Sequence, residues 1–149
     1  MTESEQLAAA IERLIAELMR RGGSIGAEPS PLSTTQALML RVLADHGPIR
    51  LGTLAALMGT TSATASRTVD VLEDTRLLAR LPDAADRRGV VVRLTSDGEE
   101  WVRRRRENLA RMVGELVQGM RPRDQHRFVE LLTQLNELLI AADREPVTH

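Results

Sequence analysis

The sequence predicts a mainly helical α+β protein in which one small β-hairpin interrupts a series of helices. Aromatic residues are nearly absent, since the 149 residues include one Trp, one Phe and no Tyr. A core of Leu, Val, Ala and Met favours packed helices over a β-sandwich. Apolar residues recur at helical spacing near both ends, and a turn-rich segment in the middle separates two short β-prone runs.

Composition excludes several classes of function. With 42% hydrophobic and 28% charged residues, the chain can form a folded core. The absence of cysteine excludes disulfides, thiolate zinc sites, iron–sulfur clusters and thiol redox sensors. A net charge of -1 creates no strong global field for a nucleic acid or a membrane. Because no apolar run approaches roughly 18 residues and the N-terminus is acidic and amphipathic, we expect a cytoplasmic protein without a membrane partner.

Helical periodicity, turn residues and capping residues predict each element in order. Gly22 and Gly23 end the first helix, and 22–31 is a loop. Ile49 and Arg50 are too few for an independent strand but can pair at a sheet edge. The predicted elements are helices over 5–20, 33–45 (capped by Ser33 or Thr34), 51–58, 61–75 (capped by Thr61), 97–119 (capped by Thr95 or Ser96) and 122–142, with strands over 77–81 and 90–94.

The segment 51–78 has the spacing of a helix-turn-helix. Ala55 supplies the small residue needed where two helices cross closely, and Gly59 tolerates the positive φ of a tight turn. Ala65, Val69 and Leu72 form an apolar stripe at i, i+4 and i+7, which predicts that the second helix packs inward along this stripe.

The outward face of that second helix is small, polar and free of acidic residues until Asp70. Such a surface can enter a major groove closely, where hydroxyls, a methyl group and a guanidinium can reach phosphates and base edges. The alternative is an ordinary amphipathic helix with a Ser/Thr-rich cap. The predicted DNA contacts on this helix are Thr61, Ser62, Ala63, Thr64, Ser66 and Arg67.

The hairpin that follows carries arginines at its tip. Its turn, PDAADRRG, places Arg87 and Arg88 beside Asp83 and Asp86. A narrow minor groove attracts arginine electrostatically, so a hairpin of this kind next to a helix-turn-helix predicts a second DNA contact. The alternative is a solvated charged turn.

Residues 54–101 resemble the winged helix-turn-helix of the multiple-antibiotic-resistance regulator (MarR) family of bacterial transcription factors. The segments SRTVDVLEDTRLL and LPDAADRRGVVVRLTSDGEE carry the resemblance, with Ala65 replacing a larger β-branched residue. It implies that Arg88 contacts the minor groove and that Asp86 helps to orient it. It also implies a ligand-responsive repressor that binds a pseudo-palindromic operator as a homodimer.

The terminal helices have apolar stripes that nothing within one chain obviously covers. We therefore expect 32–95 to form the DNA-binding lobe, and 1–31 together with 96–149 to form a helical dimerisation region of obligate type. An intramolecular bundle is the alternative. The predicted interface residues are Leu7, Ile11, Leu14, Leu18, Leu131, Leu135, Leu138 and Leu139.

The remaining polar residues do not predict an enzyme. The three histidines show no metal-ligand spacing, and His126 with Glu130 is most simply a surface pair. We therefore expect no cofactor, no metal and no catalytic residue. The run 103–106 is interpreted as arginines paired with nearby glutamates, although phosphate contact or a role beside an effector cavity is also conceivable.

An effector site is not predicted with named residues. Arg41, His46 and Trp101 are conceivable liners, but a surface arginine, a helix-end histidine and a core tryptophan are the simpler interpretations. The alternative function is a winged-helix protein–protein adaptor that does not read DNA. Such an adaptor would need neither the small, non-acidic face of 61–67 nor the arginines of the hairpin tip.

Overall fold

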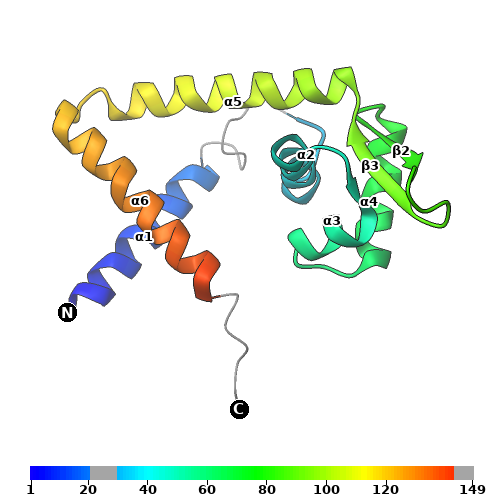
Figure 1. The fold of residues 1–149 in the computed structure, drawn as a ribbon. Coiled ribbons are helices and arrows are strands. Elements are labelled where there is room, and N and C mark those ends of the chain that lie inside the picture. Colours follow the sequence, from blue (N-terminus) through cyan, green and yellow to red (C-terminus); the bar gives the residue numbers. More distant parts are fainter. Residues whose placement is uncertain (21–29, 143–149) are drawn as a thin grey trace, which may run out of the picture. The chain divides into compact units, whose positions relative to one another are not determined.

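The structure, a computed structural model, describes residues 1–20 and 30–142 (Figure 1). Its elements follow the predicted order, and their boundaries differ from the predicted ones by two residues at most. Most of the predicted loop at 22–31 lies outside the described residues. The elements are α1 (Glu3–Arg20), α2 (Thr34–His46), β1 (Ile49–Arg50), α3 (Leu51–Leu57), α4 (Ser62–Asp74), β2 (Leu78–Pro82), β3 (Val90–Leu94), α5 (Ser96–Val117) and α6 (Pro122–Ala142).

The strands form a three-stranded antiparallel sheet in the order β1-β3-β2. The β2–β3 hairpin pairs over its full length, with Leu78 opposite Leu94 at its base. The two-residue strand β1 pairs with β3, and Ile49 lies opposite Val92. The predicted edge pairing is therefore confirmed, and β3 has a partner on both sides.

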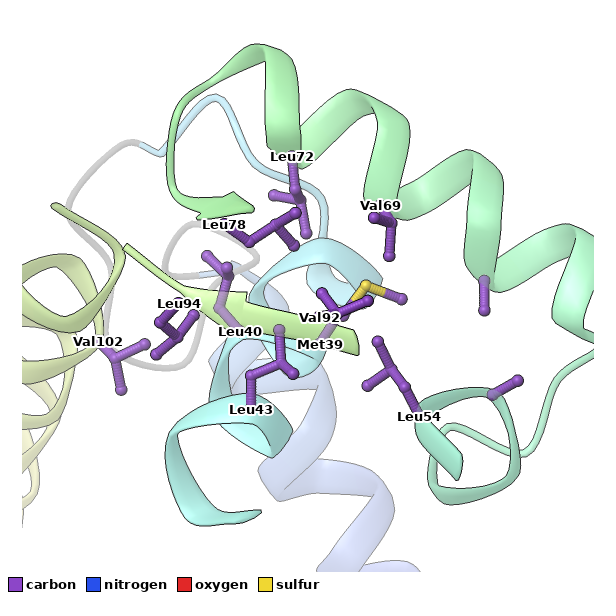
Figure 2. Close-up of a cluster of buried hydrophobic side chains, with 12 residues drawn as sticks. Met39, Leu40, Leu43, Leu54, Val69, Leu72, Leu78, Val92, Leu94 and Val102 are labelled. Atoms are coloured by element: carbon purple, nitrogen blue, oxygen red, sulfur yellow. The ribbon is translucent and has the colours of Figure 1, made fainter. Parts of the chain in front are cut away.

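One hydrophobic core joins the sheet to the helices around it. The side chains in Figure 2 come from α2, α3, α4, α5 and the hairpin and converge on one cluster. Ala65, Val69 and Leu72 are each fully buried, which confirms the predicted inward stripe of α4. The cluster consists of Met39, Leu40, Leu43, Leu54, Ala55, Ala65, Val69, Leu72, Leu78, Val92, Leu94 and Val102.

Side-chain caps fix the start of three helices. Ser33 and Gln36 form a reciprocal capping box at α2, with bonds of 3.2 and 2.9 Å between side chain and main chain. Thr61 caps α4 as predicted. At α5 the Oγ1 of Thr95 accepts from the Gly98 amide at 3.1 Å. Ser33 and Thr95 are thus the capping residues where the sequence left two choices each.

Two backbone features lie where α4 and α5 meet the hairpin, and a third lies in the turn after α3. Arg76 follows α4 with a φ of 62°, the left-handed conformation that usually needs glycine at a helix end. Gly98 brings α5 so close to the chain before β2 that a Cβ there would lie 1.9 Å from the Leu77 carbonyl oxygen. Gly59 takes a φ of 63° in the turn after α3, as the helix-turn-helix pattern predicted.

The chain divides into two compact units, Met1–Ala110 and Arg111–His149. In the first unit α1 has no buried residue, and in the second α6 has none. The predicted division into a 32–95 lobe and a dimerisation region therefore remains a prediction about the assembled protein. Among the described helices, none combines the length and apolar character needed to cross a membrane.

Candidate nucleic-acid interface

Helix α4 turns its core stripe inward and leaves its leading face in solvent. Ser62, Ala63 and Arg67 are exposed. The exposed hydroxyl of Thr61 accepts from the Thr64 amide at 3.2 Å and donates to the Thr64 hydroxyl at 3.0 Å. The helix therefore presents the predicted small, polar surface at its N-terminal end, where backbone amides and the helix dipole favour an anion such as phosphate.

Ser66 is half-buried beneath an arginine from the wing. The Arg80 guanidinium on β2 donates to both the carbonyl oxygen and the Oγ of Ser66, each at 3.1 Å. It also forms an ion pair with Asp70 at 2.6 Å. Because a hydroxyl that accepts one hydrogen bond still has its own hydrogen to donate, Ser66 keeps a donor for the predicted DNA contact.

Sequence reasoning did not identify Arg80. Two signals were available in hindsight: Arg80 occupies an alternate position of a short strand, and Ser66, Asp70 and Glu73 are spaced at i, i+4 and i+7 along α4. Neither signal shows that the strand and the helix face each other. Only the packing of β2 against α4 brings these residues together.

The wing turn is shaped by main-chain contacts of its acidic residues. The carboxylate of Asp86 accepts from the Arg88 amide at 3.0 Å, and its carbonyl oxygen accepts from the Gly89 amide at 2.9 Å. Asp86 therefore contacts the backbone that carries Arg88, and the orienting role that the resemblance implies for it stays a prediction.

Asp83 closes the base of the wing and ties it to β1. Its carboxylate accepts from the Ala85 amide at 2.9 Å and forms an ion pair with Arg50 at 2.6 Å. The Ala85 amide, followed by the charge of Arg50, holds the pKa of Asp83 below its ordinary value despite partial burial. Asp83 therefore stays ionised through the neutral range and keeps the wing attached to the sheet edge.

Three arginines of the predicted interface have no protein partner in the part of the chain that the structure describes. Among the described residues, the guanidinium groups of Arg67, Arg87 and Arg88 form no hydrogen bond or ion pair, and all three are exposed. Arg67 lies on α4, and the other two lie at the wing tip between β2 and β3 (Figure 1). Arg80 connects α4 to the strand that leads into the wing tip, so the two elements that carry these three arginines are joined by one residue.

The four arginines of the run in α5 are engaged within the protein. Glu100 accepts from two of them, and these bonds lower its pKa. The predicted pairing with nearby glutamates is confirmed for two of the four. Of the other two, one packs over an aromatic ring and one forms an ion pair with an aspartate of α2. The partners are Glu100 and Glu107 for Arg103, Glu100 for Arg104, the Trp101 ring at 5.3 Å for Arg105, and Asp45 for Arg106.

A hollow of about 280 Å³ opens between α2 and α5, and Trp101, Arg41 and Leu38 are among its lining residues. Arg41 pairs with Asp45 at 3.2 Å, and Trp101 packs against the core while remaining half-buried. His46 bonds the Val42 carbonyl oxygen through Nδ1 at 3.0 Å and does not line this hollow. His46 is therefore a helix-end histidine, as the simpler interpretation has it. Arg41 and Trp101, by contrast, line the hollow.

The part of the chain that the structure describes shows no cluster of three or more His, Asp or Glu residues able to hold a metal ion. His126 and Glu130 form an exposed pair at 3.3 Å on α6, as the sequence indicated.

Comparisons with known proteins agree with this geometry. Residues 30–89 match the sequence model described as MarR family. YhbI of Bacillus subtilis (strain 168), named an uncharacterized HTH-type transcriptional regulator, is 29% identical over 126 residues, which cover 80% of this chain and 82% of that protein. The crystal structure of RV1404 from Mycobacterium tuberculosis is 32% identical, with a TM-score of 0.75 over 90% of each chain. A MarR family protein from Bacillus stearothermophilus is 24% identical, with a TM-score of 0.81 over 94% of this chain and 99% of that one.

Proposed function

Because the chain belongs to the MarR family, we propose that it is a transcriptional regulator that binds double-stranded operator DNA. Helix α4 enters the major groove through Thr61, Ser62, Ala63, Thr64, Ser66 and Arg67. The wing reaches the adjacent minor groove through Arg87 and Arg88, whose turn Asp86 shapes. A regulator of this kind works where the chromosome is, so a cytoplasmic location is part of the proposal.

The observation that carries the proposal is that α4 and the wing tip, which Arg80 joins, both present arginines without a partner in the described chain. Arg67, Arg87 and Arg88 keep their full hydrogen-bonding capacity for an external partner, within the described chain. Arginine in this state is suited to phosphates and to the edges of guanine, because its planar fork donates two bonds at once. An acidic partner with the regular charge spacing of a DNA duplex matches two such elements better than a single protein surface does.

The proposal includes a twofold homodimer. The interface uses apolar residues of α1 and α6, most of which are exposed, because large apolar stripes are a liability in a soluble monomer. A twofold axis presents two α4 helices about 34 Å apart, one turn of DNA, and so matches a pseudo-palindromic operator. The proposed interface residues are Leu7, Ile11, Leu14, Leu18, Leu131, Leu135, Leu138 and Leu139.

The test is a fluorescence-anisotropy titration with a duplex that the wild-type protein selects from a random pool. Arg88→Ala is expected to weaken binding at least about tenfold and to leave the dimer intact, the loss expected for one arginine contact. Arg67→Ala weakens it as well, and a loss that is equal on every sequence identifies a phosphate contact.

Arg104→Ala serves as the matched control, since this arginine is already paired with Glu100 on α5. A pool that yields no enriched sequence, or an Arg88→Ala variant that binds like the wild type and like the control, counts against DNA reading. That outcome would favour the protein–protein adaptor instead. The proposal assigns no catalytic step to any residue.

Regulation by a small molecule is the second part of the proposal. The hollow between α2 and α5 combines the Trp101 ring and the Leu38 side chain with the guanidinium of Arg41, a lining suited to a small aromatic acid. Trp101 is the only tryptophan, so its fluorescence reports occupancy directly. Benzoate as the probe is expected to change this fluorescence and to weaken DNA binding over the same concentration range. A fluorescence change without an effect on DNA contradicts this part.

A further inference from the structure

A single guanidinium connects the two proposed DNA-contacting elements. Arg80 lies in the middle of β2 and reaches three residues of α4. Its Nη2 is 3.1 Å from both Ser66 oxygens and 2.6 Å from Asp70 Oδ1, and its Nη1 is 3.7 Å from Glu73 Oε2. Its backbone amide also donates to Glu73 at 3.1 Å. Side chain and main chain of one residue therefore fix strand and helix together.

The geometry of this contact is specific to arginine. Ser66, Asp70 and Glu73 lie at i, i+4 and i+7, on one face of α4 between its core stripe and its exposed face. A planar fork with five donors can satisfy several acceptors at once, whereas an ammonium is a point charge on a flexible stem. The Arg80 side chain is only 25% exposed, less than the ion-paired arginines of α5, while its partner Asp70 is 61% exposed.

The contact also sets the spacing between α4 and the wing. Arg67 follows Ser66 directly, and the wing turn begins at Asp83, three residues after Arg80. Fastening Ser66 to Arg80 therefore fixes the spacing between the cations of the helix and those of the wing. Two elements that must enter adjacent grooves together bind specific DNA more tightly when their spacing is set before binding.

We propose that Arg80 is a positioning residue for sequence-specific DNA recognition, because it holds α4 and the wing as one rigid unit. This inference rests on the proposed function. The residue touches protein rather than DNA, and its contribution is to the preference for the operator over other duplexes.

The test compares Arg80→Lys, which keeps the charge, and Arg80→Gln, which removes it, with Arg103→Gln, which removes the same charge from an ion-paired arginine within α5. The probes are the duplex selected by the wild-type protein and an unrelated duplex of equal length. Both Arg80 variants are expected to lose about tenfold in affinity for the selected duplex, the size of one base contact. Their affinity for the unrelated duplex changes by less than about threefold, because phosphate contacts supply nonspecific binding. The control variant keeps the wild-type ratio.

The double variant Asp70→Asn, Glu73→Gln separates positioning from simple electrostatics, because the two explanations predict opposite changes in DNA binding. It removes the ion-pair acceptors of Arg80 and adds two units of positive charge, so simple electrostatics predicts tighter binding to both duplexes. Positioning predicts a lower ratio of selected to unrelated affinity. Hydrogen exchange is expected to be faster at the amides of 78–90 in all three variants that break the contact.

Each outcome decides the matter. Arg80→Lys with wild-type affinity, an equal loss on both duplexes, or a double variant with an unchanged ratio overturns the positioning role. A wild-type protein that selects no sequence overturns the proposed function, and the inference with it. Folded Arg80 variants that lose the ratio of selected to unrelated affinity, while the control keeps it, support the positioning role.

Discussion

The winged lobe buries its apolar residues in a core, whereas the terminal helices leave theirs largely exposed. Every buried hydrophobic residue of the described chain lies between Ala37 and Val102. By contrast, α1 and α6 bury none of their residues, although both have leucine-rich stripes. Leu138 on α6 is 67% exposed, whereas Leu40 in the lobe is completely buried. Leucine side chains thus lie in opposite environments within one chain.

The difference shows which part of the molecule forms a closed hydrophobic core without a partner. A lobe with a closed core gains its stability from its own sequence neighbours, independently of concentration. Helices that bury none of their described residues gain most of their stability when another surface covers them. The proposed dimer therefore contributes to the stability of the terminal helices much more than to that of the lobe.

The largest expected effect comes from a charge on the terminal helices. Leu135→Asp places a carboxylate in each half of the proposed interface, where an unpaired charge costs several kcal/mol. The dimer dissociation constant should rise by at least about 100-fold, as measured by sedimentation velocity. Leu57→Asp on α3 is the control at a similarly exposed leucine. Equal effects of the two changes would break the comparison between the regions.

Truncating one leucine in the lobe and one in the terminal helices distinguishes burial within the chain from burial against a second chain. Leu40→Ala should cost about 2–5 kcal/mol of unfolding free energy at every protein concentration, because it leaves a cavity in the core. Leu138→Ala should lower stability only at concentrations where the dimer forms. Urea denaturation over a wide concentration range distinguishes them. A Leu138→Ala cost that does not depend on concentration would favour the intramolecular bundle.

Two glycines of α5 are expected to respond in opposite directions. Gly98→Ala drives a Cβ into the Leu77 carbonyl and should destabilise the protein by about 1–3 kcal/mol. Gly114→Ala meets nothing within 4 Å and should stabilise the helix by up to about 1 kcal/mol. Thermal unfolding of both variants checks this. A destabilising Gly114→Ala would instead show that a partner surface approaches closely there.

The smallest effect is a gain in the lobe itself. Arg76→Gly removes a side chain from the left-handed position after α4 and should add about 1 kcal/mol of stability. Arg93→Gly, at an exposed position of β3, is expected to lose stability instead, because glycine weakens a strand. Denaturant midpoints of the two variants are compared with the wild type. A loss with Arg76→Gly would mean that its side chain makes a contact worth more than the strain.

Local patterns predicted most of the lobe. The stripe of Ala65, Val69 and Leu72, the cap at Thr61 and the positive φ at Gly59 each follow from residue type and spacing, and all three are confirmed. Their cause is local, since periodicity, capping and turn geometry act within a few residues. For the same reason, the predicted DNA-contacting residues could be named from the sequence, and they stay predictions until DNA binding is measured.

The sequence alone determined the order of the elements and the helix that packs inward, and it named the arginines that are proposed to contact DNA. Tertiary structure decided which polar residues meet across long separations: Arg80 with Ser66, Arg50 with Asp83, and Asp45 with Arg106. Such contacts depend on how a strand packs against a helix, and packing follows from the whole core rather than from any short pattern. That is why Ser66 could be read from the sequence as a surface hydroxyl, although Arg80 already holds it.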